Sequence, residues 1–185
     1  MTLVDPRNFV VADTLRDGTV VTIRAIRPDD RGRLLEAFKK LDRASIYRRF
    51  FNPKRELTDA ELKQFTEVDF DHVVALVVTT KAQNAEIMVA GGRYITAPPS
   101  RSAEVAFTTE KDYQGRGIAR LLLARLARIA REKGVTQFEA YVLAENQPML
   151  SVFRRSGLPM QQRSEGNAIH VALSLVPECP GMPAA

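Results

Sequence analysis

The chain has 185 residues, of which 45% are hydrophobic and 26% are charged, and its formal net charge is +5. This length suits a single domain that buries a core without a metal or disulfides. The single Cys179 excludes a disulfide framework and a cluster of thiolate metal ligands, and it favours a reducing, cytoplasmic compartment.

Basic residues are spread along the chain together with acidic ones, rather than gathered into an arm interleaved with aromatic residues. We therefore expect no nucleic-acid partner, and we assign the excess charge to a solvated surface and to attraction for a polyanionic cofactor. The longest apolar runs, such as residues 73–78, are too short to cross a bilayer, and no signal segment opens the chain. We expect no membrane association.

The first part of the chain predicts a β-hairpin followed by short helices. Apolar runs on either side of Asp17-Gly18 are typical of a hairpin, and a proline followed by two acids is typical of a helix start. The predicted elements are a hairpin over residues 9–26, a helix from Pro28 to about Lys40, a short helix over 45–51, and a helix that begins with the capping-box spacing of Thr58 and Glu61.

The rest of the chain predicts a meander of three strands and then alternating helices and strands. The third strand of the meander leads into a glycine-bearing turn and an apolar helix. The predicted elements are strands over residues 72–79, 86–95 and 103–109, a helix over 117–133, a strand over 137–143, a helix over 148–156 and a hairpin over 160–175.

The turn Gln-Gly-Arg-Gly-Ile-Ala over residues 114–119 has the composition of an anion site. Its glycines let the backbone approach a ligand closely. The first turn of the following helix offers amide groups without intrahelical partners, at the positive end of the helix dipole. A diphosphate fits such a site.

Other phosphate-binding motifs fit this turn poorly. The dinucleotide fingerprint Gly-x-Gly-x-x-Gly requires a glycine where this chain has Arg120, and residues 110–113 separate the turn from the strand. The mononucleotide P-loop requires Gly-Lys-Ser or Gly-Lys-Thr, which the chain lacks. An ordinary connection between a strand and a helix remains the alternative.

The Gln-x-x-Gly-x-Ala spacing of the turn resembles the acetyl-CoA pyrophosphate loop of the GNAT (Gcn5-related) N-acetyltransferases. The order of strands and helices also resembles this family, over about residues 15–176. The resemblance implies an α/β (α+β) chain with the GNAT acyl-CoA N-acyltransferase fold, which has a central mixed, mostly antiparallel sheet with flanking helices. We expect residues 1–14 to form an extension and residues 177–185 a disordered, proline-rich tail.

The resemblance also implies that acetyl-CoA is the co-substrate and that no metal takes part. The strand before the turn would bind the pantetheine arm through its backbone, and the amides of the turn would hold the diphosphate. The side chains of Arg116 and Arg120 would either add charge near phosphate or lie on the surface. The expected cofactor-binding residues are Phe107, Thr108, Thr109, Gln114, Gly115, Arg116, Gly117, Ile118, Ala119, Arg120, Asn146 and Phe153.

Glu104 is the candidate catalytic base. Acetyl transfer needs a neutral amine, and a free lysine with a pKa of about 10.4 is neutral in only about one molecule in a few thousand at pH 7. A carboxylate that takes the proton removes this obstacle. Strand alternation points Glu104 away from the more apolar face, and the position resembles that of the base in many protein-acetylating GNAT enzymes. The alternative is a solvated residue or a salt bridge to Arg93 or Arg101.

The general acid is left unassigned. Many family members carry a tyrosine where this chain has Phe153, and a phenyl ring cannot donate a proton to the departing thiolate. A thiol pKa near 8.5 makes thiolate a fair leaving group without full protonation. Tyr113 and Tyr141 are the nearest alternatives, and each is more typical of a packed amphipathic ring. His72 and His170 are isolated from other metal-binding residues, which favours structural roles.

The acceptor is less tightly specified than the cofactor. Residues 26–62 resemble the catalytic domain of Pat-type bacterial protein lysine acetyltransferases, which modify acyl-CoA synthetases and similar proteins, so a protein lysine is expected. A small amine such as a polyamine, aminoglycoside or amino acid is one alternative, and a non-catalytic acyl-CoA sensor is another. No nucleophile motif is present, which favours direct transfer in a ternary complex. A monomer and a homodimer both remain open.

Overall fold

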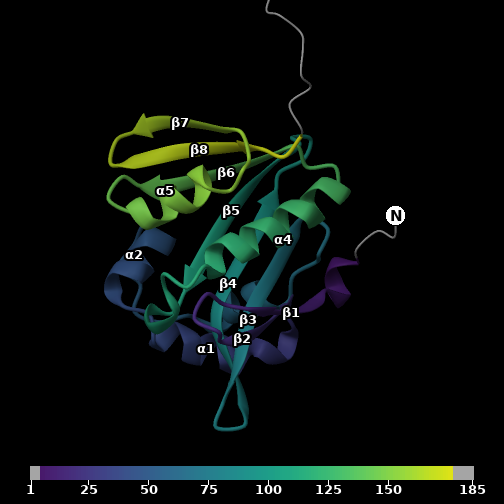
Figure 1. The fold of residues 1–185 in the computed structure, drawn as a ribbon, viewed down its shortest axis with the longest axis vertical. Helices are drawn as coiled ribbons and strands as arrows, with labels where there is room; N and C mark the ends of the chain where they lie inside the picture. The colour runs from purple at the N-terminus through teal and green to yellow at the C-terminus, as the bar shows by residue number, and fades with distance from the viewer. Residues whose placement is uncertain (1–4, 177–185) are drawn as a thin grey trace, which may run out of the picture.

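The computed structural model describes residues 5–176 (Figure 1). The predicted tail over residues 177–185 and its Cys179 lie outside the described residues. The helices are α1 (Arg31–Lys39), α2 (Arg43–Phe50), α3 (Asp59–Thr66), α4 (Ile118–Glu132) and α5 (Gln147–Arg154). The strands are β1 (Val10–Thr14), β2 (Val20–Ala25), β3 (Val73–Ala82), β4 (Ala85–Thr96), β5 (Ser102–Thr109), β6 (Gln137–Leu143), β7 (Met160–Glu165) and β8 (Ala168–Ser174).

The described strands form one mixed sheet in the order β1-β2-β3-β4-β5-β6-β8-β7. Each neighbouring pair is antiparallel except β5 and β6, which run parallel. Gln83 and Asn84 have positive φ and close the β3–β4 hairpin, as their position in the sequence predicts. The parallel pair requires a long crossover, which α4 provides. The mixed, mostly antiparallel sheet expected from the sequence is confirmed.

The sheet begins earlier than the domain boundary expected from the sequence. β1 pairs with β2 along its whole length, so residues 10–14 belong to the sheet. Gly18 lies in the connecting turn with a φ of +85°, a conformation that glycine adopts without steric cost. The hairpin predicted from Asp17-Gly18 is therefore present, and it extends across the expected boundary at residue 15.

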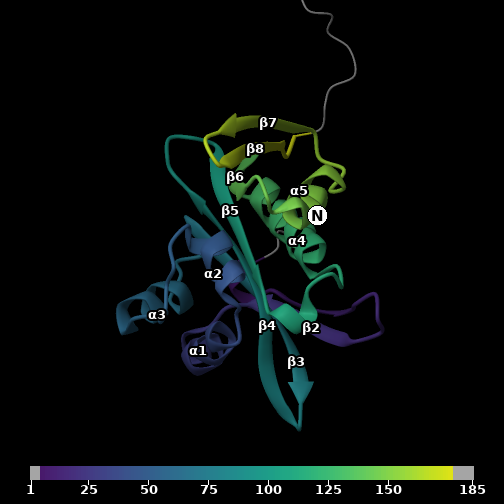
Figure 2. The ribbon, with the colours of Figure 1, turned by 90° about the vertical axis from the view of Figure 1, so that its left-hand side faces the viewer.

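Helices cover both faces of the sheet (Figure 2). α4 and α5 lie on one face, and α1, α2 and α3 lie on the other. Leu122, Leu126 and Ile129 recur on one side of α4 and are fully buried against the sheet. A smaller cluster that includes Phe38 and Leu62 lies under the helices of the other face. Within residues 5–176, no helix combines the length and apolar composition needed to span a bilayer.

Gly92 in β4 fixes which way the side chains of β5 point. A Cβ atom at this position would lie 2.9 Å from the Phe107 ring and 3.3 Å from Leu126 of α4. Phe107 therefore packs on the α4 face, in space that a side chain at residue 92 would fill. Because side chains alternate along a strand, Glu104 and Ala106 point to the face covered by α1 to α3.

A buried ion pair joins β2 to the segment that precedes α1. Arg24 is 3% exposed and Asp30 is fully buried. Two guanidinium nitrogens of Arg24 donate to the two carboxylate oxygens of Asp30 at 2.7 Å, and its Nε donates to Glu86 at 3.0 Å. Burial alone would raise the pKa of Asp30, but the hydrogen bonds from Arg24 and the Arg27 amide hold it below its ordinary value.

Candidate active site

The site lies where β5 and β6 separate. The two strands are paired only over three residues, which end at Glu104 on β5. Beyond this point β5 continues to Thr109 beside β4, and β6 continues to Leu143 beside β8. The edges that face each other across the opening are therefore unpaired with one another. Such edges carry backbone groups that can hydrogen-bond an extended ligand.

A pocket of about 610 Å³ occupies this opening, which is large enough for a cofactor-sized ligand. Its walls are formed by residues of β5, β6, α5 and α2 and by the first residues of α4. The pocket therefore brings together segments from both halves of the chain. The residues expected from the sequence that line it are Glu104, Phe107, Thr108, Thr109, Gln114, Gly115, Gly117, Ile118, Ala119, Arg120, Asn146 and Phe153.

The glycine turn presents free backbone amides to this pocket. Gly115 and Gly117 have φ values of +74° and +94°, so the turn depends on the left-handed conformation that glycine allows. Gly117 is the residue that precedes the first turn of α4. Among the described residues, the amides of residues 115–120 donate no hydrogen bond to the protein. The helix dipole adds positive potential at the same place, so the turn suits a phosphate ligand.

Side-chain contacts hold the turn in position. The Gln114 amide donates to the Thr109 carbonyl and to the Ser45 hydroxyl of α2, both at 3.1 Å. On the other side, Arg16 of the first hairpin packs against Gly117 and lines the pocket. The Arg116 side chain is not part of the pocket lining, since it pairs with Asp17. The sequence left its role open, and the structure places its guanidinium on the surface side of the turn.

The charge of the pocket is strongly unbalanced. Among the described residues that line it are five arginines and a single carboxylate, Glu104. Such an excess of positive charge suits a ligand that carries several phosphates. The five arginines are Arg16, Arg48, Arg49, Arg120 and Arg155.

Glu104 lies at the point of separation, on the last paired residue of β5. Its side chain is exposed to the pocket, and among the described residues it has no hydrogen bond or ion pair. The charges of Arg49 and Arg93 are near enough to interact with it. This carboxylate is therefore both accessible and positioned where the two strands open.

Aromatic rings line the inner part of the pocket. Phe153 is 1% exposed, and its ring centre lies 6.3 Å from that of Phe107, so it acts as packing. Tyr113 lies under the Arg116 guanidinium, whereas Tyr141 is 48% exposed and stacks on His170 at 4.9 Å. Both tyrosines line the pocket. The structure thus gives Phe153 no donor function.

Several pocket residues were not singled out from the sequence. Arg16 comes from the first hairpin, and Ser45, Arg48 and Arg49 come from α2. Only the doublet at residues 48–49 offered a local signal, as a pair of cations in the last turn of a short helix. Within residues 5–176, no cluster of His, Cys, Asp and Glu has the composition of a metal site.

Comparison with known proteins identifies the family of this chain. A family model described as the acetyltransferase (GNAT) domain matches residues 21–159. The chain belongs to the GNAT acetyltransferase family. Members of this family are N-acetyltransferases, and acetyl-CoA is the acetyl donor that they use. The unpaired amides and the arginine-rich lining of the pocket fit that donor.

Two relatives carry the name acetyltransferase. This chain is 36% identical over 145 residues to acetyltransferase Pat of Mycolicibacterium smegmatis. The match covers 77% of this chain and 42% of that protein. The chain is 30% identical over 137 residues to acetyltransferase PA5475 of Pseudomonas aeruginosa, covering 74% of each. The chain thus spans less than half the length of the first relative.

Solved structures show the same fold. The GNAT domain of S. lividans PAT superposes with a TM-score of 0.80 and 32% identity, covering 89% of this chain and 96% of that one. A cAMP-binding acyltransferase from Mycobacterium smegmatis gives a TM-score of 0.63 and 29% identity, covering 95% of this chain and 50% of that one. The yncA protein of Salmonella typhimurium, solved with acetyl-CoA, gives a TM-score of 0.66 at 19% identity, covering 89% and 99%.

Proposed function

We propose that this GNAT domain transfers the acetyl group of acetyl-CoA to the ε-amine of a lysine on another protein, with Glu104 as the base. The observation that carries the proposal is the position of Glu104. It is the only carboxylate among the described residues that line the pocket, and it stands where β5 and β6 separate. An amine that enters beside it meets a proton acceptor next to the cofactor pocket.

Glu104 solves the protonation problem of the acceptor. A lysine binds as an ammonium, because its pKa is about 10.4. The carboxylate takes one proton, directly or through a water molecule, and leaves the nitrogen lone pair free. The lone pair attacks the thioester carbonyl carbon, the carbon–sulfur bond breaks, and the thiolate of CoA leaves with the bonding electrons. The nitrogen, which is positively charged after the attack, loses its second proton to water and becomes the amide nitrogen. General-base help of this kind is worth about 10²- to 10⁴-fold in rate.

The cofactor would be held largely by backbone groups. The unpaired edge at residues 105–109 would receive the pantetheine arm as an added strand, which is a common way to bind extended ligands. The amides of residues 115–120 would receive the diphosphate at the start of α4. Arg16 and Arg120 would add charge beside it. Asn146 caps α5 through the Met149 amide and would form the far wall.

The leaving thiolate needs no dedicated acid in this scheme. Phe153 has no proton to give, and a thiol with a pKa of about 8.5 departs as a thiolate at modest cost. Tyr141 is the exposed hydroxyl on the β6 wall, and its ring is stacked on His170. In this scheme the departed thiolate takes its proton from water.

The choice of a protein lysine is supported by similarity to Pat. The match to the S. lividans PAT domain covers 89% of this chain, and the family model spans residues 21–159, which include the helices α1 to α3 of the proposed acceptor side. The pocket also offers little that would hold a polycation. Its described lining has one carboxylate against five arginines, so a polyamine or an aminoglycoside meets mostly like charge.

The proposal is tested by CoA release with purified acyl-CoA synthetases, lysine peptides and small amines as acceptors, with the modified atom located by mass spectrometry. We expect modification of lysine side chains in proteins. Small amines winning by a large margin would reject the protein acceptor. Binding of acetyl-CoA, seen as a rise in the midpoint of thermal unfolding, without transfer to any amine would indicate a sensor instead.

Glu104→Gln separates the base from the binding site. This substitution keeps the size of the side chain and removes its ability to take a proton. We expect kcat to fall about 10²- to 10⁴-fold while the Kd of acetyl-CoA stays unchanged. Glu165→Gln on the exposed strand β7 is the matched control and should leave both constants unaltered. Equal turnover in Glu104→Gln would remove this residue from the mechanism.

A further inference from the structure

We propose that Arg49 and Arg93 form a subsite that binds a carboxylate of the acceptor, a few bonds away from the amine that Glu104 deprotonates. The inference rests on the proposed function, because it names a chemical feature of the same acceptor. It assigns a specificity role to two side chains from separate elements, the last turn of α2 and the second half of β4.

Arg49 lies at the junction of two cavities. It lines the cofactor pocket and also a second, apolar cavity between the sheet and α1. Its guanidinium carbon lies 5.1 Å from the centre of the Phe50 ring, so the cation is held by an aromatic face rather than by an acid. Phe50, Ala106 and Thr108 also line both cavities, so the two cavities border the same few side chains around Arg49.

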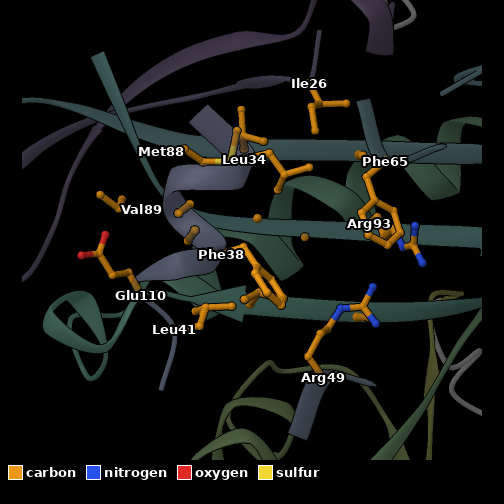
Figure 3. A pocket seen from close by; sticks show the side chains of 18 of the residues that line it. Ile26, Leu34, Phe38, Leu41, Arg49, Phe65, Met88, Val89, Arg93 and Glu110 are labelled. Atoms are coloured by element: carbon orange, nitrogen blue, oxygen red, sulfur yellow. The ribbon is translucent and has the colours of Figure 1, made fainter. Parts of the chain in front are cut away.

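Arg93 reaches the same place from the sheet. It is paired with Ala106 of β5, so its side chain projects from the same face as Glu104. Its guanidinium carbon lies 4.7 Å from the centre of the Phe65 ring of α3. Figure 3 shows the guanidinium groups of Arg49 and Arg93 at the same end of the apolar cavity.

The two cations are incompletely compensated. Within the described part of the chain, neither guanidinium has a hydrogen bond or an ion pair. Burial, together with the charge of Arg93, lowers the pKa of Arg49 to about 10, and burial also lowers the pKa of Arg93. Glu104 opposes both shifts, but one carboxylate cannot balance two cations. Both stay charged at neutral pH and would gain from one more anion.

The shape of the surrounding space suggests how an acceptor fits. The apolar cavity has a volume of about 110 Å³ and is lined by side chains such as Leu34, Phe38 and Met88. Glu110 lies at the opposite end of this cavity from the two arginines (Figure 3). A carboxylate oxygen of Glu110 is 3.7 Å from the Lys40 nitrogen. Arg49 and Arg93, whose charges interact with that of Glu104, are thus at the other end from Glu110. An acceptor with its amine at Glu104 and a carboxylate at the arginine pair would place its aliphatic part against the apolar wall.

A carboxylate is the anion that this arrangement favours. Two guanidinium groups give planar donors that match carboxylate oxygens, and such charge-assisted hydrogen bonds contribute more than neutral ones. The carboxylate has two possible sources, an acidic side chain close to the target lysine in a protein or the acid group of a small amino acid. Both sources present the same chemistry to the subsite.

The first test compares acceptors that differ only in this group. Wild-type protein is assayed with lysine peptides that carry Asp or Asn next to the lysine, and with ω-amino acids of increasing length and their primary amides. We expect the acid form to have a KM roughly tenfold or more below that of its amide, with similar kcat. The series that shows the contrast identifies the source of the carboxylate. Equal KM values for acids and amides in every series overturn the proposal.

The second test removes the cations. In Arg93→Gln and Arg49→Gln, the advantage of acid over amide acceptors should shrink about tenfold. In Arg93→Gln, whose side chain is not part of the cofactor-pocket lining, the KM for amides and the Kd of acetyl-CoA should change little. Arg93→Lys should restore only part of the advantage, because it lacks the planar fork. Arg163→Gln on the exposed strand β7 is the control and should keep the full contrast. Thermal unfolding of each variant shows that it is folded.

A third measurement does not depend on turnover. The Nε–H signals of Arg49 and Arg93 in an NMR spectrum should shift saturably with glutarate but not with glutaramide. If neither signal responds, the subsite is rejected. If the wild-type protein prefers malonyl-CoA over acetyl-CoA and the variants lose this preference, the pair recognises the acyl donor and the proposal is wrong. Failure of all amines to accept acetyl groups would instead reject the proposed function, and the glutarate titration would still decide on the subsite.

Discussion

The molecule has two groups of arginines, the buried Arg24 and the partly buried pair of Arg49 and Arg93, whose charges are compensated differently. Arg24 has a bidentate bond to Asp30 at 2.7 Å and a third bond to Glu86 at 3.0 Å. Arg49 and Arg93 contact aromatic rings and share the more distant charge of Glu104. The charge of Arg24 is fully compensated by carboxylates of the fold itself. The second group leaves donors available, as expected of a place that receives a ligand.

The contrast separates stability from recognition. A fully paired buried cation belongs to the fold, because removing its partner leaves a charge in a poorly solvated place. An incompletely paired cation costs stability in the free protein and contributes to binding when its anion arrives. The predictions that follow test whether the two groups differ in this way, from the largest expected effect to the smallest.

Asp30→Asn should give the largest loss of stability. The substitution leaves the Arg24 guanidinium buried and short of one carboxylate, while Glu86 retains its single bond. Breaking a buried pair in this way costs about 3–5 kcal/mol in the free energy of unfolding. Urea unfolding followed by circular dichroism measures the change. Glu36→Gln on the exposed side of α1 is the control and should cost less than about 0.5 kcal/mol.

The same ion pair should make the protein sensitive to acid. The pKa of Asp30 lies below its ordinary value of 3.8 in the folded state, so its contribution to stability is fully present above that value. It is lost as pH falls through the folded pKa. The free energy of unfolding of the wild type should therefore drop more steeply below about pH 4 than that of Asp30→Asn. Parallel curves for the two proteins would contradict this assignment.

Arg116→Gln should have the smallest effect. Its guanidinium pairs with Asp17 where both side chains are partly exposed, and it lies outside the pocket lining. Pairs of this kind contribute about 0–1 kcal/mol. We expect the Kd of acetyl-CoA to change less than about threefold, measured by isothermal titration calorimetry. A tenfold loss of affinity would show that this side chain reaches the phosphates when acetyl-CoA is bound.

The sequence predicted the glycine-turn side of the pocket better than the proposed acceptor side. The glycine turn, the helix after it and the strand before it are contiguous, so spacing over residues 103–133 carried the information. Alternation along β5 correctly placed Glu104 on the face opposite Phe107. Such signals are local, and they need no knowledge of how distant segments meet.

The acceptor side depends on contacts that no local pattern reveals. Arg49 and Arg93 are separated by more than forty positions and come near each other only because α2 packs beside β5, which pairs with β4. Arg16 reaches the glycine turn because the first hairpin lies beside the start of α4. The separation of β5 from β6 after three pairs is likewise a property of the whole sheet. These features can be recognised only when the three-dimensional fold is known.

The central claim is that Glu104 supplies the neutral amine, and the pH dependence of a single turnover tests it most directly. Wild type and Glu104→Gln are mixed with saturating acetyl-CoA and a lysine acceptor between pH 6 and pH 9. Without the carboxylate, the rate should rise about tenfold per pH unit, because only the neutral amine from solution reacts. The ratio of wild-type to variant rates should therefore shrink steadily as pH increases. A ratio that stays constant across this range would contradict the account.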